Sequence, residues 1–175
     1  MQRIEAAYTY DGPTASVNTV EKLLNIPINH YVVFNFLSFI KLIDAVGGID
    51  VNVKQAFDGV TKDGPGSIHF DAGKQHLDGT KALSYARERH SDNDIMRGFR
   101  QQEIIQAVED KLKSGQSIMK IMDIIDSLNG NIQTDVDSNE LTHLVKEGLT
   151  WTNYDKQQLS FDWRTFSNEG RSMVE

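Results

Sequence analysis

The stretch FLSFIKLIDAVGGIDVNV, residues 36–53, decides the fold class. Over residues 36–46 its apolar residues recur at the spacing of one helix face. Gly47 then supplies a residue that readily adopts the left-handed conformation in which many helices end. Over residues 49–53 apolar and polar residues alternate, which is the pattern of a half-buried strand. A helix that leads directly into a strand predicts an α/β domain.

The flanking segments extend this pattern in both directions. Upstream, Pro13 suits the first turn of a helix that runs to about Leu24, with Val20, Leu23 and Leu24 facing the interior. Residues 31–34 have the composition of a buried strand. We therefore expect a central mixed β-sheet flanked by helices.

Downstream, residues 58–70 are rich in glycine, aspartate and serine, which predicts a loop. Further helices are expected at residues 80–87, at 95–113, around 118–125 and after a cap at Ser138, and a closing strand is expected at 159–163. These elements form one domain over residues 1–166, followed by a polar, frayed tail over residues 167–175.

Composition and charge narrow the classes of function. The 175 residues are 39% hydrophobic and 25% charged, which is ordinary for a globular domain. The net charge of −7 argues against a general nucleic-acid binder, because such proteins usually present a basic face. The sequence contains no cysteine, which excludes disulfides, thiol catalysis and Cys-type zinc sites. It also contains no apolar run near the roughly 20 residues that span a bilayer.

The segment LSYARERHSDNDIMRGFRQQ, residues 83–102, carries the candidate chemistry. It contains four arginines, which are Arg87, Arg89, Arg97 and Arg100. On the long helix, the apolar stripe of residues 104–112 continues back to Gln101 and Arg97 at helical spacing. An inward face that changes from apolar to Arg and Gln indicates the mouth of a pocket, because such groups are costly to bury without partners.

The start of the long helix favours an anion. Asp94 fits the N-cap position, which makes Arg97 the third helical residue. Backbone amides, the positive end of the helix dipole and guanidinium groups would then converge on one phosphate site. The alternative is that residues 87–89 form a solvated surface, with Asp92 and Asp94 neutralising the arginines. Spacing alone leaves both interpretations open.

Several motifs resemble, in the same order, those of the LytR-CpsA-Psr family. The most specific is Leu-x-Gly…Ala-Leu-x-Tyr-x-Arg-x-Arg over residues 77–89, followed by Asp-x-x-Arg-x-x-Arg-Gln over residues 94–101. Further matching positions are Ala6-Ala7-Tyr8, Phe39, Ile43-Asp44, Gly47-Gly48-Ile49, Val51 and Gly73. The resemblance covers residues 6 to about 150.

The resemblance implies a bacterial enzyme that an N-terminal helix anchors at the extracytoplasmic face of the cell membrane. Such enzymes transfer an anionic glycopolymer, such as teichoic acid or capsule, from a polyprenyl-pyrophosphate carrier to peptidoglycan. The matching positions that would hold the pyrophosphate are Arg87, Arg89, Arg97 and Gln101, and Arg100 and Asp94 are assigned to the same site. Arg87 and Arg89 are the candidate catalytic residues.

The resemblance also implies a lipid pocket and a metal. Candidates for contact with the polyprenyl chain are Phe36, Ile40, Ile105 and Val108, although plain core is the simpler interpretation of each. The family's magnesium-binding aspartates precede the Ala-Ala-Tyr motif. We therefore expect the first strands to be missing here, Mg²⁺ to act in the full-length protein, no metal to bind tightly to this chain, and this chain alone to be inactive.

Three functions remain open. The first is the phosphotransferase, and the second is a non-catalytic fragment that binds polyprenyl phosphate through the arginines. The third is a cell-envelope-related transcriptional regulator, since that label has been attached to the family. The sequence shows no recognition helix with a basic face, and its net charge opposes DNA.

Overall fold

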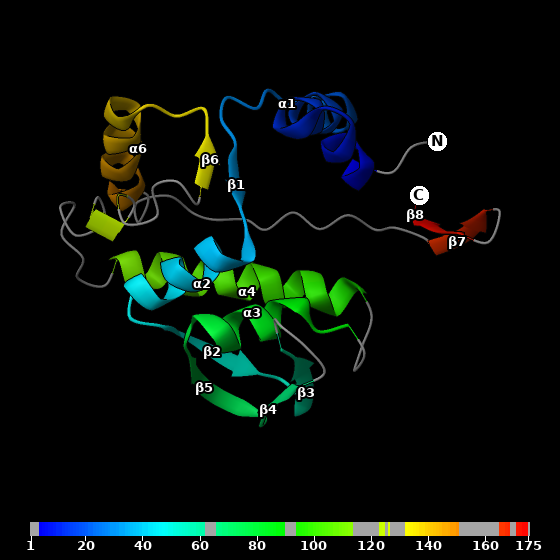
Figure 1. Ribbon diagram of the computed structural model, residues 1–175, viewed down its shortest axis with the longest axis vertical. Helices are drawn as coiled ribbons and strands as arrows, with labels where there is room; N and C mark the ends of the chain where they lie inside the picture. The colour runs from blue at the N-terminus through cyan, green and yellow to red at the C-terminus, as the bar shows by residue number, and fades with distance from the viewer. Residues whose placement is uncertain are drawn as a thin grey trace.

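The computed structural model describes residues 4–61, 66–89, 94–113, 123–124, 126, 132–150, 165–168 and 171–174 (Figure 1). Its helices are α1 (Ile4–Leu24), α2 (Phe36–Ala45), α3 (Gly79–Arg87), α4 (Asp94–Lys113) and α6 (Ser138–Thr150). Its strands are β1 (Val32–Phe34), β2 (Ile49–Val53), β3 (Phe57–Val60), β4 (Ser67–Phe70), β5 (Gly73–Leu77), β6 (Ile132–Thr134), β7 (Thr165–Asn168) and β8 (Arg171–Val174). The α/β class is confirmed.

The strands pair two by two. Within the described residues, the antiparallel pairs are β1 with β6, β2 with β5, β3 with β4, and β7 with β8. In the β2–β5 pair, Ile49 lies opposite Leu77 and Val53 lies opposite Gly73. The sequence predicts a central mixed sheet, whereas the described strands form these small antiparallel ladders among the helices.

Helix α2 and the turn after it form as the sequence predicts. The Asn35 side chain accepts a hydrogen bond from the Ser38 amide at 2.8 Å, and the Ser38 hydroxyl accepts one from the Asn35 amide at 2.9 Å. Gly47 and Gly48 have φ angles of 83° and 78°. A Cβ on Gly48 would lie 2.9 Å from the Leu77 carbonyl oxygen, so the turn has no room for a side chain. Strand β2 then alternates buried and exposed residues throughout.

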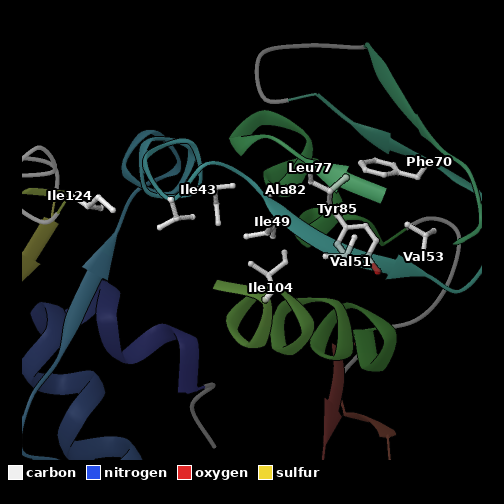
Figure 2. Packing of buried hydrophobic residues seen from close by; sticks show 12 residues of the cluster. Ile43, Ile49, Val51, Val53, Phe70, Leu77, Ala82, Tyr85, Ile104 and Ile124 are labelled. Carbon is white, nitrogen blue, oxygen red and sulfur yellow. The ribbon is translucent and has the colours of Figure 1, made fainter. Parts of the chain in front are cut away.

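The core lies where α2, α3 and α4 pack around β2 and β5, in the lower part of Figure 1. Figure 2 shows side chains from these elements meeting, with Ile49 and Leu77 from the paired strands, Ile43 from α2 and Ile104 from α4. All four are at most 3% exposed. Burying each such side chain contributes roughly 1.5–3 kcal/mol, so this cluster holds α3 and α4 in fixed relation.

The prediction of a loop at residues 58–70 is wrong. Strands β3 and β4 form a hairpin there, in which Phe57 lies opposite Phe70 and Val60 lies opposite Ser67. The rings of Phe57 and Phe70 stack with their centroids 4.8 Å apart, and both lie against Tyr85. The polar composition was misleading because the few apolar residues of the hairpin, Phe57, Ile68 and Phe70, are enough to dock it against the core.

The predicted burial of the N-terminal segments is met only in part, since Val20 and Val33 are half-buried. Helix α1 is kinked at Asp11 and Gly12, so Pro13 begins its second part as expected. Leu23 and Leu24, predicted to face the interior, are 61% and 38% exposed, and residues 32 and 34 of β1 are exposed too. Periodicity locates an apolar stripe, but it does not say which element covers that stripe.

At the C-terminal end, Asp137 caps α6 in place of Ser138. Its carboxylate accepts hydrogen bonds from the amides of Asn139 at 2.8 Å and Glu140 at 2.9 Å. The tail predicted to fray, residues 167–175, contains β8 and the last two residues of β7, which pair with each other. Of the expected helix at 118–125 only residues 123 and 124 are described, and they are helical, while the expected strand at 159–163 lies outside the described residues.

Candidate functional site

A pocket with a volume of about 510 Å³ lies where the C-terminal end of α3 meets the first half of α4. Its lining residues are Val60, Ala86, Arg87, Arg89, Arg97 and Gln101. Three guanidinium groups and one carboxamide therefore share one concavity, and none of the described lining residues is acidic. A concave surface lined by one sign of charge focuses the electrostatic potential, so this pocket favours an anion.

Helix α3 is held in place at its start. Asp78 caps it by accepting a hydrogen bond from the Lys81 amide at 2.8 Å. The Gly79 amide donates to the Asp44 carboxylate of α2 at 2.7 Å. A Cβ on Gly79 would lie 2.3 Å from the Ile40 carbonyl oxygen, so the two helices approach closely only because this residue is glycine. The last residue of α3 is Arg87, which the helix delivers to the pocket.

Helix α4 supplies the opposite wall. Arg97 and Gln101 are four residues apart and therefore share one helix face, and both line the pocket. Further along α4, Ile104 and Ala107 are buried in the core. The predicted stripe is therefore confirmed only in part, because Arg97 and Gln101 line the pocket but Ile105, which belongs to the stripe, is 60% exposed.

Arg87 has a hydrogen-bond donor that the described structure leaves without an acceptor. Its guanidinium lies over the Phe36 ring, with Cζ 4.7 Å from the ring centroid. Its Nη1 atom is buried and makes no hydrogen bond within the described structure. A buried donor without a partner costs about 1–3 kcal/mol. An anion in the pocket would remove that cost.

The other lining groups differ in exposure. Arg97 is half-buried, whereas Arg89 and Gln101 are exposed. Gln101 also donates through Nε2 to the Ala86 carbonyl oxygen at 3.4 Å. That carbonyl belongs to the last turn of α3, where carbonyl groups lack partners within the helix. Gln101 therefore lines the pocket and also contacts the end of α3.

Arg100 is not among the lining residues. It is 6% exposed, and it donates through Nε to the Tyr85 carbonyl oxygen at 3.1 Å and through Nη2 to the Glu88 carbonyl oxygen at 2.6 Å. Its Cζ also lies 5.5 Å from the centroid of the Phe57 ring. The sequence groups Arg100 with the pyrophosphate ligands, but successive helical residues differ by about 100° in direction. Arg100 therefore lies outside the pocket, although the next residue in the sequence, Gln101, lines it.

The remaining predicted site residues have mixed placements. Helix α4 begins at Asp94, so the structure makes this residue helical, and its side chain is outside the description. Of the lipid candidates, Phe36 is 49% exposed and Ile105 is 60% exposed, which rules out plain core for both. Ile40 and Val108 are half-buried. The Phe36–Arg87 contact places one lipid candidate next to a pocket residue.

Two lining residues escaped the sequence analysis. Val60 ends β3, inside the segment predicted to be a loop, and Ala86 lies between the motif residues Tyr85 and Arg87. Ala86 could have been found from its place in the Tyr-x-Arg-x-Arg motif. No local signal identifies Val60, because the hairpin reaches the pocket only through its packing against α3.

The described residues include no group of three or more His, Asp or Glu side chains that could hold a metal ion. Asp92 and the Asp94 side chain are not part of that description. The helices that the structure describes also include none with the length and apolar character needed to cross a membrane.

Comparison with known proteins identifies relatives of this chain. The model of the LytR_cpsA_psr family matches residues 1–173. The polyisoprenyl-teichoic acid–peptidoglycan teichoic acid transferase TagU of Oceanobacillus iheyensis is 39% identical over 153 residues, which cover 83% of this chain and 46% of that protein. This chain therefore spans less than half the length of that curated relative.

Solved structures agree with the family match. One, called a transcriptional regulator from Enterococcus faecalis, has a TM-score of 0.81 and 32% identity over 99% of this chain and 62% of that chain. Another, called TagT bound to LIIa-WTA, has a TM-score of 0.79 and 28% identity over 98% of this chain and 64% of that chain. Because the family model covers almost every residue and solved structures share the fold, this chain belongs to the LytR_cpsA_psr family.

Proposed function

We propose that the protein is a phosphotransferase that moves an anionic glycopolymer, such as teichoic acid, from a polyprenyl-pyrophosphate carrier to peptidoglycan. The observation that carries the proposal is the pocket between α3 and α4, with three arginines, one glutamine and a buried Arg87 Nη1 that makes no hydrogen bond. The transferase relative supports the choice of substrates, because TagU of O. iheyensis is named for that reaction.

The pocket suits a pyrophosphate. Arginine is charged at every working pH, and its planar fork can donate two parallel hydrogen bonds to phosphate oxygens. Arg87 and Arg89 reach the pocket from α3 and the residues after it, while Arg97 and Gln101 reach it from α4. Donors from two walls can therefore contact both phosphates of one ligand and fix its orientation.

The same residues can assist the transfer. The hydroxyl oxygen of the acceptor sugar attacks the phosphorus that carries the glycopolymer, and it gives up its proton to a base. The bond from that phosphorus to the bridging oxygen breaks, and polyprenyl phosphate leaves with the electron pair. Arg87 and Arg89 stabilise the negative charge that grows on the leaving phosphate. Positioning and charge stabilisation of this kind supply most of the catalysis in phosphoryl transfer.

Exposed apolar side chains beside the pocket support a lipid-linked substrate. Phe36 is half exposed and lies under the Arg87 guanidinium, so a hydrocarbon tail on Phe36 would place its head group at Arg87. Ile105, which is 60% exposed on α4, adds a second apolar contact. We propose that these two residues, with Ile40 and Val108, contact the polyprenyl chain.

Magnesium is proposed for the whole protein, as the family resemblance implies. The described residues do not fit the ion, because they contain no cluster of three or more His, Asp or Glu side chains. The metal ligands are therefore proposed to lie outside the described residues. No step above depends on the ion.

The substrates also suggest a location. A polyprenyl carrier resides in the membrane and peptidoglycan lies outside it, so we propose that the protein works at the extracytoplasmic face of the cell membrane, with an anchor elsewhere in the whole protein. The net charge of −7 opposes binding to membranes through anionic lipid head groups. Attachment through an anchor agrees with that charge.

The test is the binding of a polyprenyl pyrophosphate in detergent. Replacing Arg87 by Ala removes charge-assisted hydrogen bonds that contribute about 1.5–3 kcal/mol each, so the dissociation constant should rise roughly 10- to 100-fold. The matched control is Lys113→Ala, which removes a cation that pairs with Glu109 near the far end of α4. Equal losses in both variants would mean diffuse electrostatic attraction and would contradict the proposal.

Two further measurements separate the competing functions. Transfer of a radiolabelled glycopolymer to peptidoglycan by the whole protein distinguishes the phosphotransferase from a non-catalytic polyprenyl-phosphate binder, which would bind the lipid and transfer nothing. A salt titration with duplex DNA tests the regulator, which one structural relative is called. A regulator would show specific, salt-dependent binding, whereas we expect none.

A further inference from the structure

We propose that Arg100 is a positioning residue, which holds the arginine pocket in shape from behind without contacting the ligand. This inference rests on the proposed anion-binding function of the pocket. It goes beyond that function, because Arg100 lies outside the lining and its role is to fix the residues that form it.

The geometry is that of a clamp on the end of a helix. One guanidinium group binds two backbone carbonyls that are three residues apart, with Nε on Tyr85 at 3.1 Å and Nη2 on Glu88 at 2.6 Å. The Tyr85 carbonyl belongs to the last turn of α3, and the Glu88 carbonyl belongs to the cap residue that follows the helix. Carbonyl groups at a helix end lack partners within the helix. A cation at a helix C-terminus also interacts favourably with the helix dipole.

The clamped segment carries two of the pocket arginines. Arg87 lies between the two clamped residues, and Arg89 directly follows the second one. Glu88, between these two arginines, is completely buried, and its carbonyl oxygen accepts the shorter of the two Arg100 bonds. Fixing this turn limits the directions in which Arg87 and Arg89 can point, and it lowers the entropy that they would lose on binding an anion.

The clamp also joins the two walls of the pocket. Arg97 and Gln101 lie on the same helix as Arg100, within one turn of it on either side. The Gln101 contact to Ala86 spans 3.4 Å, which is long for a hydrogen bond. The two shorter bonds of Arg100 are therefore the stronger of these ties between the α3 wall and the α4 wall.

Lysine cannot replace this arrangement. Its ammonium group is a compact point charge, whereas the guanidinium presents donors in a rigid planar fork. The aromatic faces of Phe57 and Tyr85, with centroids 5.5 and 6.0 Å from Arg100 Cζ, further favour a planar cation. Arg100→Lys keeps the charge and loses the two-point clamp, so it separates geometry from electrostatics.

The experiment compares wild type with Arg100→Lys, Arg100→Met and Ile104→Val. The control Ile104→Val removes one buried methyl group a turn further along α4 and leaves the clamp intact. Titration calorimetry with inorganic pyrophosphate measures affinity, and the arginine Nε–Hε resonances of Arg87 and Arg89 report their environment without a ligand. Thermal unfolding shows which variants remain folded.

We expect Arg100→Lys to weaken pyrophosphate binding about tenfold. Residues that orient metal ligands act in the same indirect way, and their replacement lowers metal affinity by about 10- to 100-fold. The resonances of Arg87 and Arg89 should move in both Arg100 variants and stay in place in Ile104→Val, which should bind as wild type does. If Arg100→Met fails to fold, Arg100→Lys gives the answer alone.

Two results would overturn the inference. One is Arg100→Lys with wild-type affinity and unmoved resonances. The other is a loss of affinity in Ile104→Val as large as that in Arg100→Lys, which would mean general destabilisation. Wild-type protein that does not bind pyrophosphate would refute the proposed function instead, and the resonances of the ligand-free variants would still decide the role of Arg100.

Discussion

The two halves of α4 have similar cations in opposite surroundings. In the first half, Arg97 lines the pocket and Arg100 binds the carbonyls at the end of α3. In the second half, Lys111 pairs with Asp50 at 2.8 Å and Lys113 pairs with Glu109. The described contacts of the first half are with backbone carbonyls and an open concavity, whereas those of the second half are with carboxylates, one of them exposed and one half-buried.

This difference shows why a count of basic residues does not locate a site. A lysine paired with an exposed carboxylate is already satisfied, and such pairs contribute about 0–1 kcal/mol. Arg87 reaches a pocket with no acidic lining residue among those described, and its buried Nη1 makes no hydrogen bond there, so an anion from solvent can supply that partner. The partner that each cation faces, and not its charge, decides its function.

The largest effect should come from the core of the second half. Ile104 is 3% exposed, and Ile104→Ala should lower the free energy of unfolding by about 2–5 kcal/mol, because it leaves a cavity. The neighbouring Ile105→Ala, at a site 60% exposed, should change it by less than about 0.5 kcal/mol. Urea denaturation measures both. Similar losses would show that the two sites do not differ in packing.

An intermediate effect should appear at the pocket. Arg97→Ala should raise the dissociation constant for inorganic pyrophosphate roughly 10- to 100-fold, since it removes charge-assisted hydrogen bonds of about 1.5–3 kcal/mol each. Lys111→Ala removes one positive charge from the same helix and should leave the constant unchanged. Calorimetry at one ionic strength compares them, and a matching loss in the lysine variant would erase the distinction between the halves.

The smallest effect concerns the surface pair. The hydrogen bond from Lys111, and then that from His76, lowers the pKa of Asp50 below its ordinary value of 3.8. A lowered carboxyl pKa stabilises the fold above the ordinary value, and that contribution is lost as the pH falls through the lowered pKa. Because the Asp50 side chain is 65% exposed, Lys111→Met should cost only a few tenths of a kcal/mol at neutral pH.

The pH dependence of the Lys111→Met effect serves as the control. The difference in unfolding free energy between Lys111→Met and wild type should shrink as acid protonates Asp50, and denaturation curves at neutral and acidic pH measure it. If the difference in unfolding free energy grew as the pH fell, the Lys111–Asp50 pair could not be its cause.

Much of the site was predictable from local patterns. The motif over residues 77–101 contains five of the six lining residues, and helical spacing places Arg97 and Gln101 on one face. The functional role of these residues stays a prediction. The separation of Arg100 from the pocket was not predictable, because neighbours on a helix diverge by about 100° and the sequence does not say which direction faces the cavity.

The sequence by itself determined the helix–glycine–strand unit of residues 36–53, since periodicity and the left-handed φ of Gly47 are properties of adjacent residues. It also determined the family, through motifs that survive in order along the chain. Tertiary structure alone decided that β3 pairs with β4, that Phe36 is exposed beside Arg87, and that Arg100 is buried. The reason is physical, because burial and hydrogen-bond partners depend on which distant surface a side chain meets, and neighbouring residues do not specify that surface.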